Sequence, residues 1–357
     1  MSRCDDYQRS HLSILSCALI QTSNETSQGG FEQKLIQRAI IHDGKFELVR
    51  FLVKTVKGPA WVLAIILLAG CANEVPEDWE KPINYRLASY FLAGAFNWTR
   101  PFPAFRVAGE IYGVGTHDLM VFFIPSGEGH VLINTGVEGS FHQIKENIES
   151  LGYDIGDVKI LLTMQAHWDH VAEFARIKHL TGAQVWATKD DTPLLEDGGI
   201  SDPHMGGETG IRFRPVEVDR IIQDGELISV GDIFLRVHEH PGHTPGSASY
   251  TTEVIEDGVS YQVAIVNMAS RNPGVSLIEK PTYPGIDKDF ATTLEKQQRM
   301  DVDIWVSAHA GFFKLHEKYQ PGDTYEVSTF YDPEGYDEAI ETFELLYREQ
   351  RQSELDE

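Results

Sequence analysis

The feature that most constrains this 357-residue chain is a run of ten residues that directly follows an apolar segment. The segment from Val158 to Leu162 predicts a buried strand, and the run from Thr163 to Ala172 reads TMQAHWDHVA. Within six positions this run supplies one amide, two imidazoles and one carboxylate, from Gln165, His167, Asp169 and His170. A tight loop at a strand end can direct these side chains to one point, and zinc takes imidazole nitrogen and carboxylate oxygen where no thiolate is available. The run therefore predicts a metal site.

Further donors indicate that the site holds more than one metal ion. Asp169 and His170 are adjacent, so on a tightly turning backbone they point in different directions and could serve two ions. His243 lies in HPGHTPGS, after an apolar stretch, and His309 lies in VSAHAG, also after an apolar stretch. A lone histidine of this kind is more often a hydrogen-bonded structural residue. Three donor loops after strands in one chain favour a two-metal centre instead.

These residues carry a specific resemblance. The run Gln-Ala-His-Trp-Asp-His resembles the His-x-His-x-Asp-His signature of the metallo-β-lactamase superfamily. Later segments resemble subclass B3 metallo-β-lactamases, above all the GOB type with glutamine at the first ligand position: HPGHTPGSAS at 240–249, NPG at 272–274, PTYPG at 281–285 and AHAGFFKLHEK at 308–318. The resemblance implies an α/β fold, the αββα sandwich, in which two β-sheets lie face to face with helices outside and metals at one edge.

The resemblance also implies a site. It implies two zinc ions, the first held by Gln165, His167 and His243 and the second by Asp169, His170 and His309. A hydroxide between the ions would attack a β-lactam carbonyl, because zinc lowers the pKa of bound water to about 7. Asp169 would be catalytic, orienting this hydroxide and relaying its proton. Because an amide oxygen is a weaker donor than an imidazole, Gln165 predicts a first site that holds its metal less tightly.

The function implied is that of a β-lactamase, which opens the β-lactam ring of penicillins, cephalosporins or carbapenems. Glyoxalase-type and lactonase-type relatives supply a bridging aspartate after the position of His243, and residues 264–270 contain no carboxylate. This disfavours a metallo-hydrolase of lactones or thioesters without eliminating it. A metal-binding protein without turnover is a third interpretation, indicated by Gln165. Ser270 is expected to bind the substrate carboxylate, with a loop-capping hydroxyl as the alternative.

Cysteine placement narrows the subclass and bears on location. No cysteine lies beyond Cys71, which excludes the subclasses that bind the second zinc through a thiolate. Lys54 and Lys57 precede an apolar stretch, and Leu-Ala-Gly-Cys at 68–71 resembles a bacterial lipobox. The stretch is shorter than the roughly 20 residues of a membrane-spanning helix, which favours a cleaved signal over a transmembrane anchor. A buried core helix is the alternative.

This interpretation predicts the organisation of the chain. We expect an N-terminal extension and lipoprotein-type signal at 1–70, a tether at 71–98 and a metallo-β-lactamase domain at 99–357. The protein would then be anchored in the bacterial periplasm by lipid on Cys71, with no other membrane contact. Residues 1–50 are long for a signal and indicate a translation start placed too far upstream.

Length and charge limit the number of domains and the classes of partner. The 287 residues from Cys71 onward suffice for one large domain, and they keep 22 basic and 48 acidic residues, a formal net charge of −26. Such a chain offers no basic groove for phosphates, which argues against nucleic acid and favours a small β-lactam substrate. The sequence does not indicate an oligomeric state.

Apolar periodicity predicts the main elements. Strands are expected at 119–125, 130–134, 159–163, 233–239, 262–266 and 303–307, and a helix at 141–151. The acidic segment 332–357 carries apolar residues at helical intervals and predicts a docking helix that packs through Tyr336, Ile340, Phe343 and Leu346.

Overall fold

The computed structural model describes residues 33–42, 45–54, 76, 79, 97–207 and 210–356. The chain divides into two compact units, Met1–Gly70 and Cys71–Glu357. In the first unit, β1 (Gln33–His42) pairs antiparallel with β2 (Lys45–Lys54). The lipobox-like segment and most of the expected tether lie outside the described residues. Among the helices that are described, none has the length and apolar character needed to cross a membrane.

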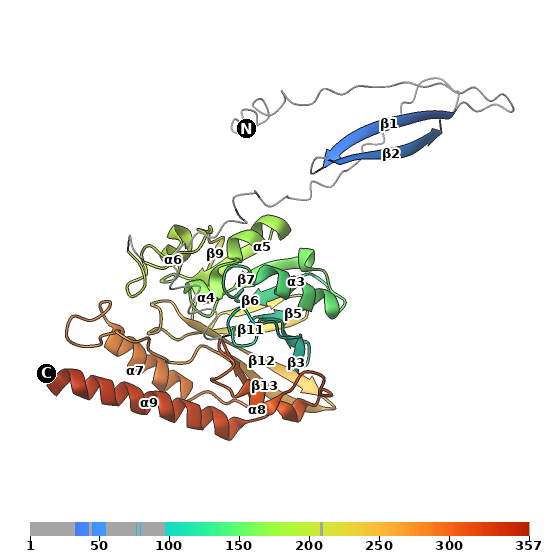
Figure 1. Ribbon diagram of the computed structural model, residues 1–357. Coiled ribbons are helices and arrows are strands. Elements are labelled where there is room, and N and C mark those ends of the chain that lie inside the picture. The colour runs from blue at the N-terminus through green and yellow to red at the C-terminus, as the bar shows by residue number, and fades with distance from the viewer. Residues whose placement is uncertain are drawn as a thin grey trace. The chain divides into compact units, whose positions relative to one another are not determined.

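The second unit contains two β-sheets (Figure 1). The seven-stranded sheet has the order β3 (Phe105–Ala108), β4 (Ile111–Gly113), β5 (Phe122–Ile124), β6 (His130–Ile133), β7 (Val158–Leu162), β8 (Gln184–Thr188) and β9 (Arg220–Ile222). The five-stranded sheet has the order β10 (Leu227–Val230), β11 (Ile233–Glu239), β12 (Ala248–Glu256), β13 (Val259–Val266) and β14 (Ile304–Ser307). Strands β6 to β9 are parallel, as are β13 and β14, and the other pairs are antiparallel.

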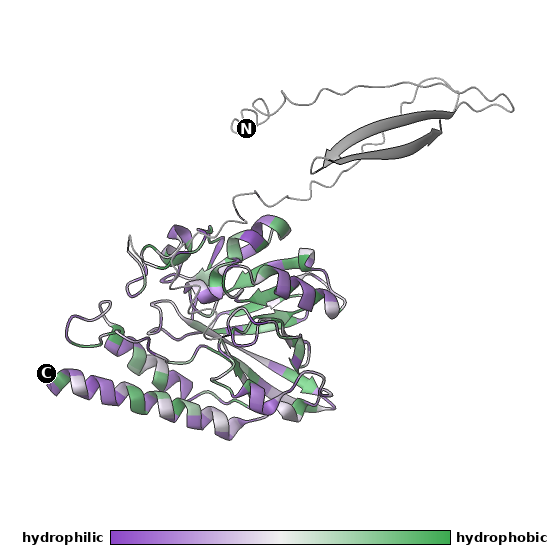
Figure 2. Ribbon diagram, in the orientation of Figure 1, coloured by the Kyte–Doolittle hydropathy of each residue, from purple (hydrophilic) through white to green (hydrophobic). Residues whose placement is uncertain are grey.

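Side chains of the central strands alternate between two apolar cores. In β7, Ile160 and Leu162 join the core shared with the five-stranded sheet, whereas Leu161 joins the core beneath α3 (Phe141–Ser150) and α5 (Phe174–Thr181). A strand buried on both faces needs apolar residues at successive positions, which explains the apolar run from Ile160 to Leu162 after the exposed Lys159. The hydrophobic strands lie inside, and helices of mixed polarity lie outside (Figure 2).

Helices cover the other face of the five-stranded sheet. The helix α7 (Ile286–Gln297) lies beside α9 (Pro333–Asp356), and Phe290 of α7 and Ile340 of α9 are buried in the same core as Trp305 of β14 (Figure 1). The other short helices in the described part of the chain are η2 (Ile155–Asp157), α4 (Trp168–Val171), α6 (Thr192–Asp197), α8 (Leu315–Lys318) and η3 (Val327–Thr329). Two sheets between two layers of helices form the αββα sandwich, so the predicted fold is confirmed.

The docking helix is present as α9, with one correction to its packing face. Tyr336 and Ile340 are buried as predicted, but Leu346 is 44% exposed and Tyr347 is buried in its place. The prediction for Leu346 was wrong because a 3.6-residue period that starts at Tyr336 reaches 347 on its third turn.

Strand directions explain why distant donors meet. The parallel strands β6, β7 and β8 end at one edge of their sheet, and β11, β13 and β14 run in a common direction in the other sheet. The loops after β7, β11 and β14 carry His167, His243 and His309 respectively. The edge formed by these strand ends is therefore where the predicted ligands gather.

Candidate metal centre

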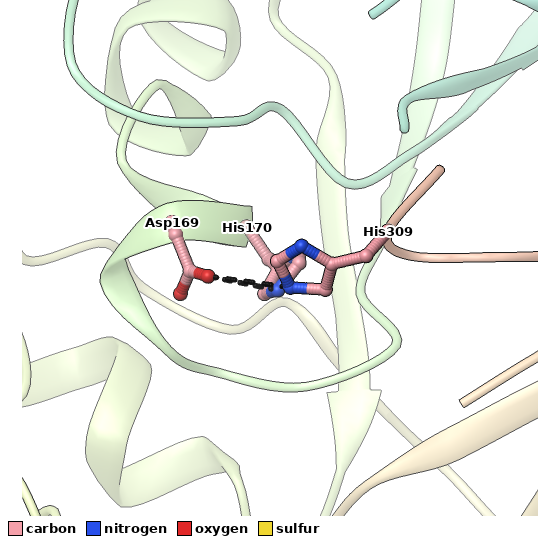
Figure 3. A group of neighbouring side chains, drawn as sticks. All are labelled: Asp169, His170 and His309. Carbon is pink, nitrogen blue, oxygen red and sulfur yellow. Dashed lines mark ion pairs between the residues drawn. The ribbon is translucent and has the colours of Figure 1, made fainter. Parts of the chain in front are cut away.

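Three of the predicted ligands form a compact group (Figure 3). Asp169 and His170 lie in the single turn of α4, and His309 lies two residues after β14. The Oδ2 atom of Asp169 is 3.2 Å from Nε2 of His170 and 3.6 Å from Nε2 of His309. Two donors on one tetrahedral zinc ion lie about 3.3 Å apart, given metal–ligand bonds of about 2.0–2.2 Å. The spacing of this group fits a zinc ion.

The other three predicted ligands lie on neighbouring loops. Nδ1 of His167 faces Nε2 of His243 at 3.1 Å, the same donor spacing. Gln165 is buried, and its Oε1 atom has no hydrogen-bond partner within the described part of the chain. A buried carbonyl oxygen without a partner is costly unless something binds it, and a metal ion would do so. The donor chemistry and the unpartnered oxygen fit a second zinc ion.

The charge states of these side chains suit metal binding. Burial lowers the pKa of His243 to about 3 and also lowers the pKa of His170, so both imidazoles are neutral at pH 7. Burial acts to raise the pKa of the Asp169 carboxyl, but the neighbouring His170 and His309 outweigh it and hold that pKa well below its usual range. The group therefore presents an ionised carboxylate at Asp169 and neutral imidazoles at His170 and His243, the forms that coordinate zinc. Burial acts to lower the pKa of His167, but the Asp202 carboxylate beside it outweighs burial and raises that pKa.

Further hydrogen bonds fix the orientation of the histidines. Nδ1 of His309 lies 3.1 Å from Oδ2 of Asp118, which also accepts a hydrogen bond from Nε1 of Trp98. Nδ1 of His243 donates to the carbonyl oxygen of Ser270 at 2.8 Å. Each contact leaves Nε2 of the histidine for a metal, as is usual for metal-binding imidazoles. Asp118 was not predicted, because nothing in the sequence separates it from the other acidic residues.

Ser270 thus lies directly beside a proposed ligand. Its hydroxyl oxygen is 3.0 Å from the same Nδ1 atom of His243 that its carbonyl oxygen contacts. The structure places Ser270 at the metal centre, and its contact with a substrate carboxylate stays a prediction.

Two polar side chains support the ligand loops. Asn134 adopts a left-handed backbone conformation with φ of 65°, and its Oδ1 atom accepts a hydrogen bond from the backbone N–H of Met164. Asp191, 1% exposed, follows β8 and accepts hydrogen bonds from the N–H groups of Ala166 and Gly246 and from the Thr244 hydroxyl. Asp191 therefore joins the loop of His167 to the loop of His243.

Gly246 is required for the close approach of the His243 loop to Asp191. A Cβ atom at Gly246 would lie 2.3 Å from the backbone nitrogen of Asp191 and 2.3 Å from the Thr188 hydroxyl. The absence of a side chain lets the Gly246 N–H reach the carboxylate of Asp191.

Two tryptophans pack beside the centre. Trp168 is buried within the ligand run and makes an edge contact with Trp98 at a ring separation of 5.6 Å. The Trp98 ring also lies 5.8 Å from the His309 ring. Trp98, at the end of the expected tether, thus contributes to the wall of the metal centre.

Histidines and a carboxylate gathered at the edge of an αββα sandwich fit a metal-dependent hydrolase. The sequence profile of the metallo-beta-lactamase superfamily matches residues 115–254. The solved class B3 di-zinc metallo-beta-lactamase LRA-12 from an Alaskan soil metagenome is 40% identical, with a TM-score of 0.69, over 71% of this chain and 96% of that one. Metallo-beta-lactamase GOB-18 from Elizabethkingia meningoseptica is 39% identical, with a TM-score of 0.70, over 72% and 95%. The chain belongs to the metallo-β-lactamase superfamily and is a zinc hydrolase of the class B3 type.

Curated relatives match more distantly. The probable metallo-hydrolase YqgX of Bacillus subtilis is 29% identical over 157 residues, which are 43% of this chain and 71% of that protein. A hydroxyacylglutathione hydrolase of a Bradyrhizobium species is 30% identical over 107 residues, which are 30% of this chain and 33% of that protein. Both relatives are named as hydrolases, and these matches do not identify the substrate of this chain.

Proposed function

We propose that this protein is a β-lactamase that hydrolyses the ring amide of β-lactam antibiotics. The observation that carries the proposal is the pair of donor groups at the sheet edge, one of Gln165, His167 and His243 and one of Asp169, His170 and His309. The identity of 39–40% to proteins named as class B3 metallo-beta-lactamases supports it. We propose two zinc ions per chain, with the Gln165 site the weaker.

The side chains have distinct roles in this proposal. Zinc, when bound, supplies a water that ionises near pH 7 and a Lewis acid for the carbonyl oxygen. The Asp169 carboxylate would accept the proton of the attacking water and pass it to the leaving amide nitrogen. The Ser270 hydroxyl, beside His243, would donate a hydrogen bond to the substrate carboxylate. His167 and Gln165, both buried, would hold the first ion together with His243.

Thioester hydrolysis is the alternative that the hydroxyacylglutathione hydrolase match favours. That match covers one third of the relative. The segment after β13, which includes the buried Asn267, offers no carboxylate to bridge two metals. The site therefore favours the β-lactam over the thioester.

One assay separates these functions. The purified protein with zinc is given a chromogenic cephalosporin, an acyl-homoserine lactone and a glutathione thioester, each with and without a chelator. We expect turnover of the cephalosporin that the chelator abolishes and added zinc restores, because every proposed catalytic step needs the metal. Turnover of the lactone or thioester alone would contradict the proposal. Hydrolysis of none of the three substrates would favour a metal-binding protein without turnover.

We also propose that the protein is anchored by lipid in the bacterial periplasm. The proposal rests on the Leu-Ala-Gly-Cys sequence at 68–71 and the basic and apolar residues before it. Expression in a bacterium with labelled palmitate should give a labelled, membrane-bound protein, and Cys71→Ser should lose the label. Equal labelling of parent and variant, or no label on either, would overturn this proposal.

A further inference from the structure

A loop outside the ligand set carries a carboxylate into the metal centre. The Asp202 loop, residues 198–207, follows α6 and is held by a hydrogen bond from the N–H of Gly207 to the carbonyl of Ile200. Asp202 is 8% exposed, and its Oδ1 atom accepts hydrogen bonds from the N–H groups of His204 and Met205, both at 2.8 Å. Its orientation is therefore fixed by its own loop, independently of any metal ligand.

The second oxygen of this carboxylate contacts a proposed ligand. Oδ2 of Asp202 is 3.1 Å from Nε2 of His167, whose Nδ1 atom faces His243. A carboxylate that accepts a hydrogen bond from Nε2 fixes the imidazole in the tautomer with a free lone pair on Nδ1 and makes that nitrogen a better donor. Asp202 therefore directs the lone pair of His167 toward the metal position.

The first site needs such a partner more than the second. Its proposed ligands, Gln165, His167 and His243, include no carboxylate, and His243 is oriented by the neutral carbonyl of Ser270. The second site has the charged ligand Asp169 and the charged partner Asp118. A divalent cation held by ligands that include no carboxylate lacks a compensating charge. Asp202 is placed to supply it.

We propose that Asp202 is a positioning residue that compensates for the weak amide ligand Gln165 by fixing the His167 tautomer and adding negative charge beside the first zinc ion. The inference rests on the zinc assignment in the proposed function and not on the substrate. Zinc binding can be measured without any substrate, so its failure is distinguishable from the failure of the β-lactamase proposal.

The test replaces Asp202 by asparagine. An asparagine can keep its Oδ1 atom on the N–H groups of His204 and Met205, but its NH₂ group then faces Nε2 of His167, where an acceptor is needed. The substitution is made in two backgrounds, His309→Ala, which leaves the first site to be measured, and His243→Ala, which leaves the second. Zinc affinity is measured by competition with a chromogenic chelator, and folding by circular dichroism.

We expect Asp202→Asn to weaken first-site zinc binding by about 10–100-fold and to leave second-site binding unchanged, which also serves as the folding control. Adding Gln165→His to the Asp202→Asn protein should restore most of the lost affinity, because imidazole is the stronger donor. An unchanged first-site affinity would overturn the proposal, as would an equal loss at both sites. A first site that Gln165→His does not rescue would overturn the compensation for Gln165.

Discussion

Replacement of Asp169 by asparagine should lower kcat/KM for the cephalosporin by at least about 10³-fold, which corresponds to about 4 kcal/mol of transition-state stabilisation. The carboxylate lies within 3.2 Å of His170 and 3.6 Å of His309, so it serves both as a proposed zinc ligand and as the proton acceptor. An amide is a weaker zinc ligand and cannot accept the proton at pH 7. One substitution therefore removes two functions.

The measurement pairs steady-state kinetics with zinc content. Asp301→Asn is the matched control, because Asp301 is an exposed aspartate before β14 and should keep the parental rate and zinc content. If Asp169→Asn retains more than a tenth of the parental rate, Asp169 has neither role. If this variant loses zinc but the parent does not hydrolyse the cephalosporin, Asp169 is a zinc ligand and the proposed substrate is wrong.

The strands predicted from the sequence include several that are buried on both faces and the alternating strand β11. The strands β6, β7 and β14 carry apolar residues at successive positions, and the expected ranges overlap them closely. The strands β3, β4, β8, β9, β10 and β12 were not predicted. Among them β9 and β10 have only three and four residues, with one buried residue each. Periodicity needs more residues than these strands contain.

Some residues of the candidate site could likewise be predicted from the sequence, and others could not. The ligand run could be predicted because four donors lie within six residues after one strand. Asp118 could not, since it is 191 positions from His309 and no local pattern links them. Asp191 was accessible in principle, because it follows β8, whose carboxyl end adjoins that of β7. Acidic residues are so frequent in this chain, 54 in all, that a lone aspartate carries little information.

Asp191→Ala should lower the free energy of unfolding by about 3 kcal/mol at pH 7.5, because it leaves the buried N–H groups of Ala166 and Gly246 without an acceptor. It also removes one of the two hydrogen-bond partners of the Thr244 hydroxyl, the other being the Ser247 hydroxyl. Urea unfolding of both metal-free proteins measures this difference. An equal free energy of unfolding for the parent and Asp191→Ala would show that Asp191 does not hold the loops of His167 and His243 together.

The difference in unfolding free energy between the parent and Asp191→Ala should depend on pH, and burial of Asp191 sets the direction. Burial raises the pKa of Asp191 to about 6, above its usual 3.8, despite the hydrogen bonds that lower it. The folded state then binds the proton more tightly than the unfolded state, so this stabilisation is present at low pH and is lost as the pH rises through 6. The stability advantage of the parent over Asp191→Ala should therefore shrink by about 1.4 kcal/mol between pH 5 and 7.5. An advantage that grows over this range would mean that the three donors stabilise the ionised carboxylate more than burial destabilises it.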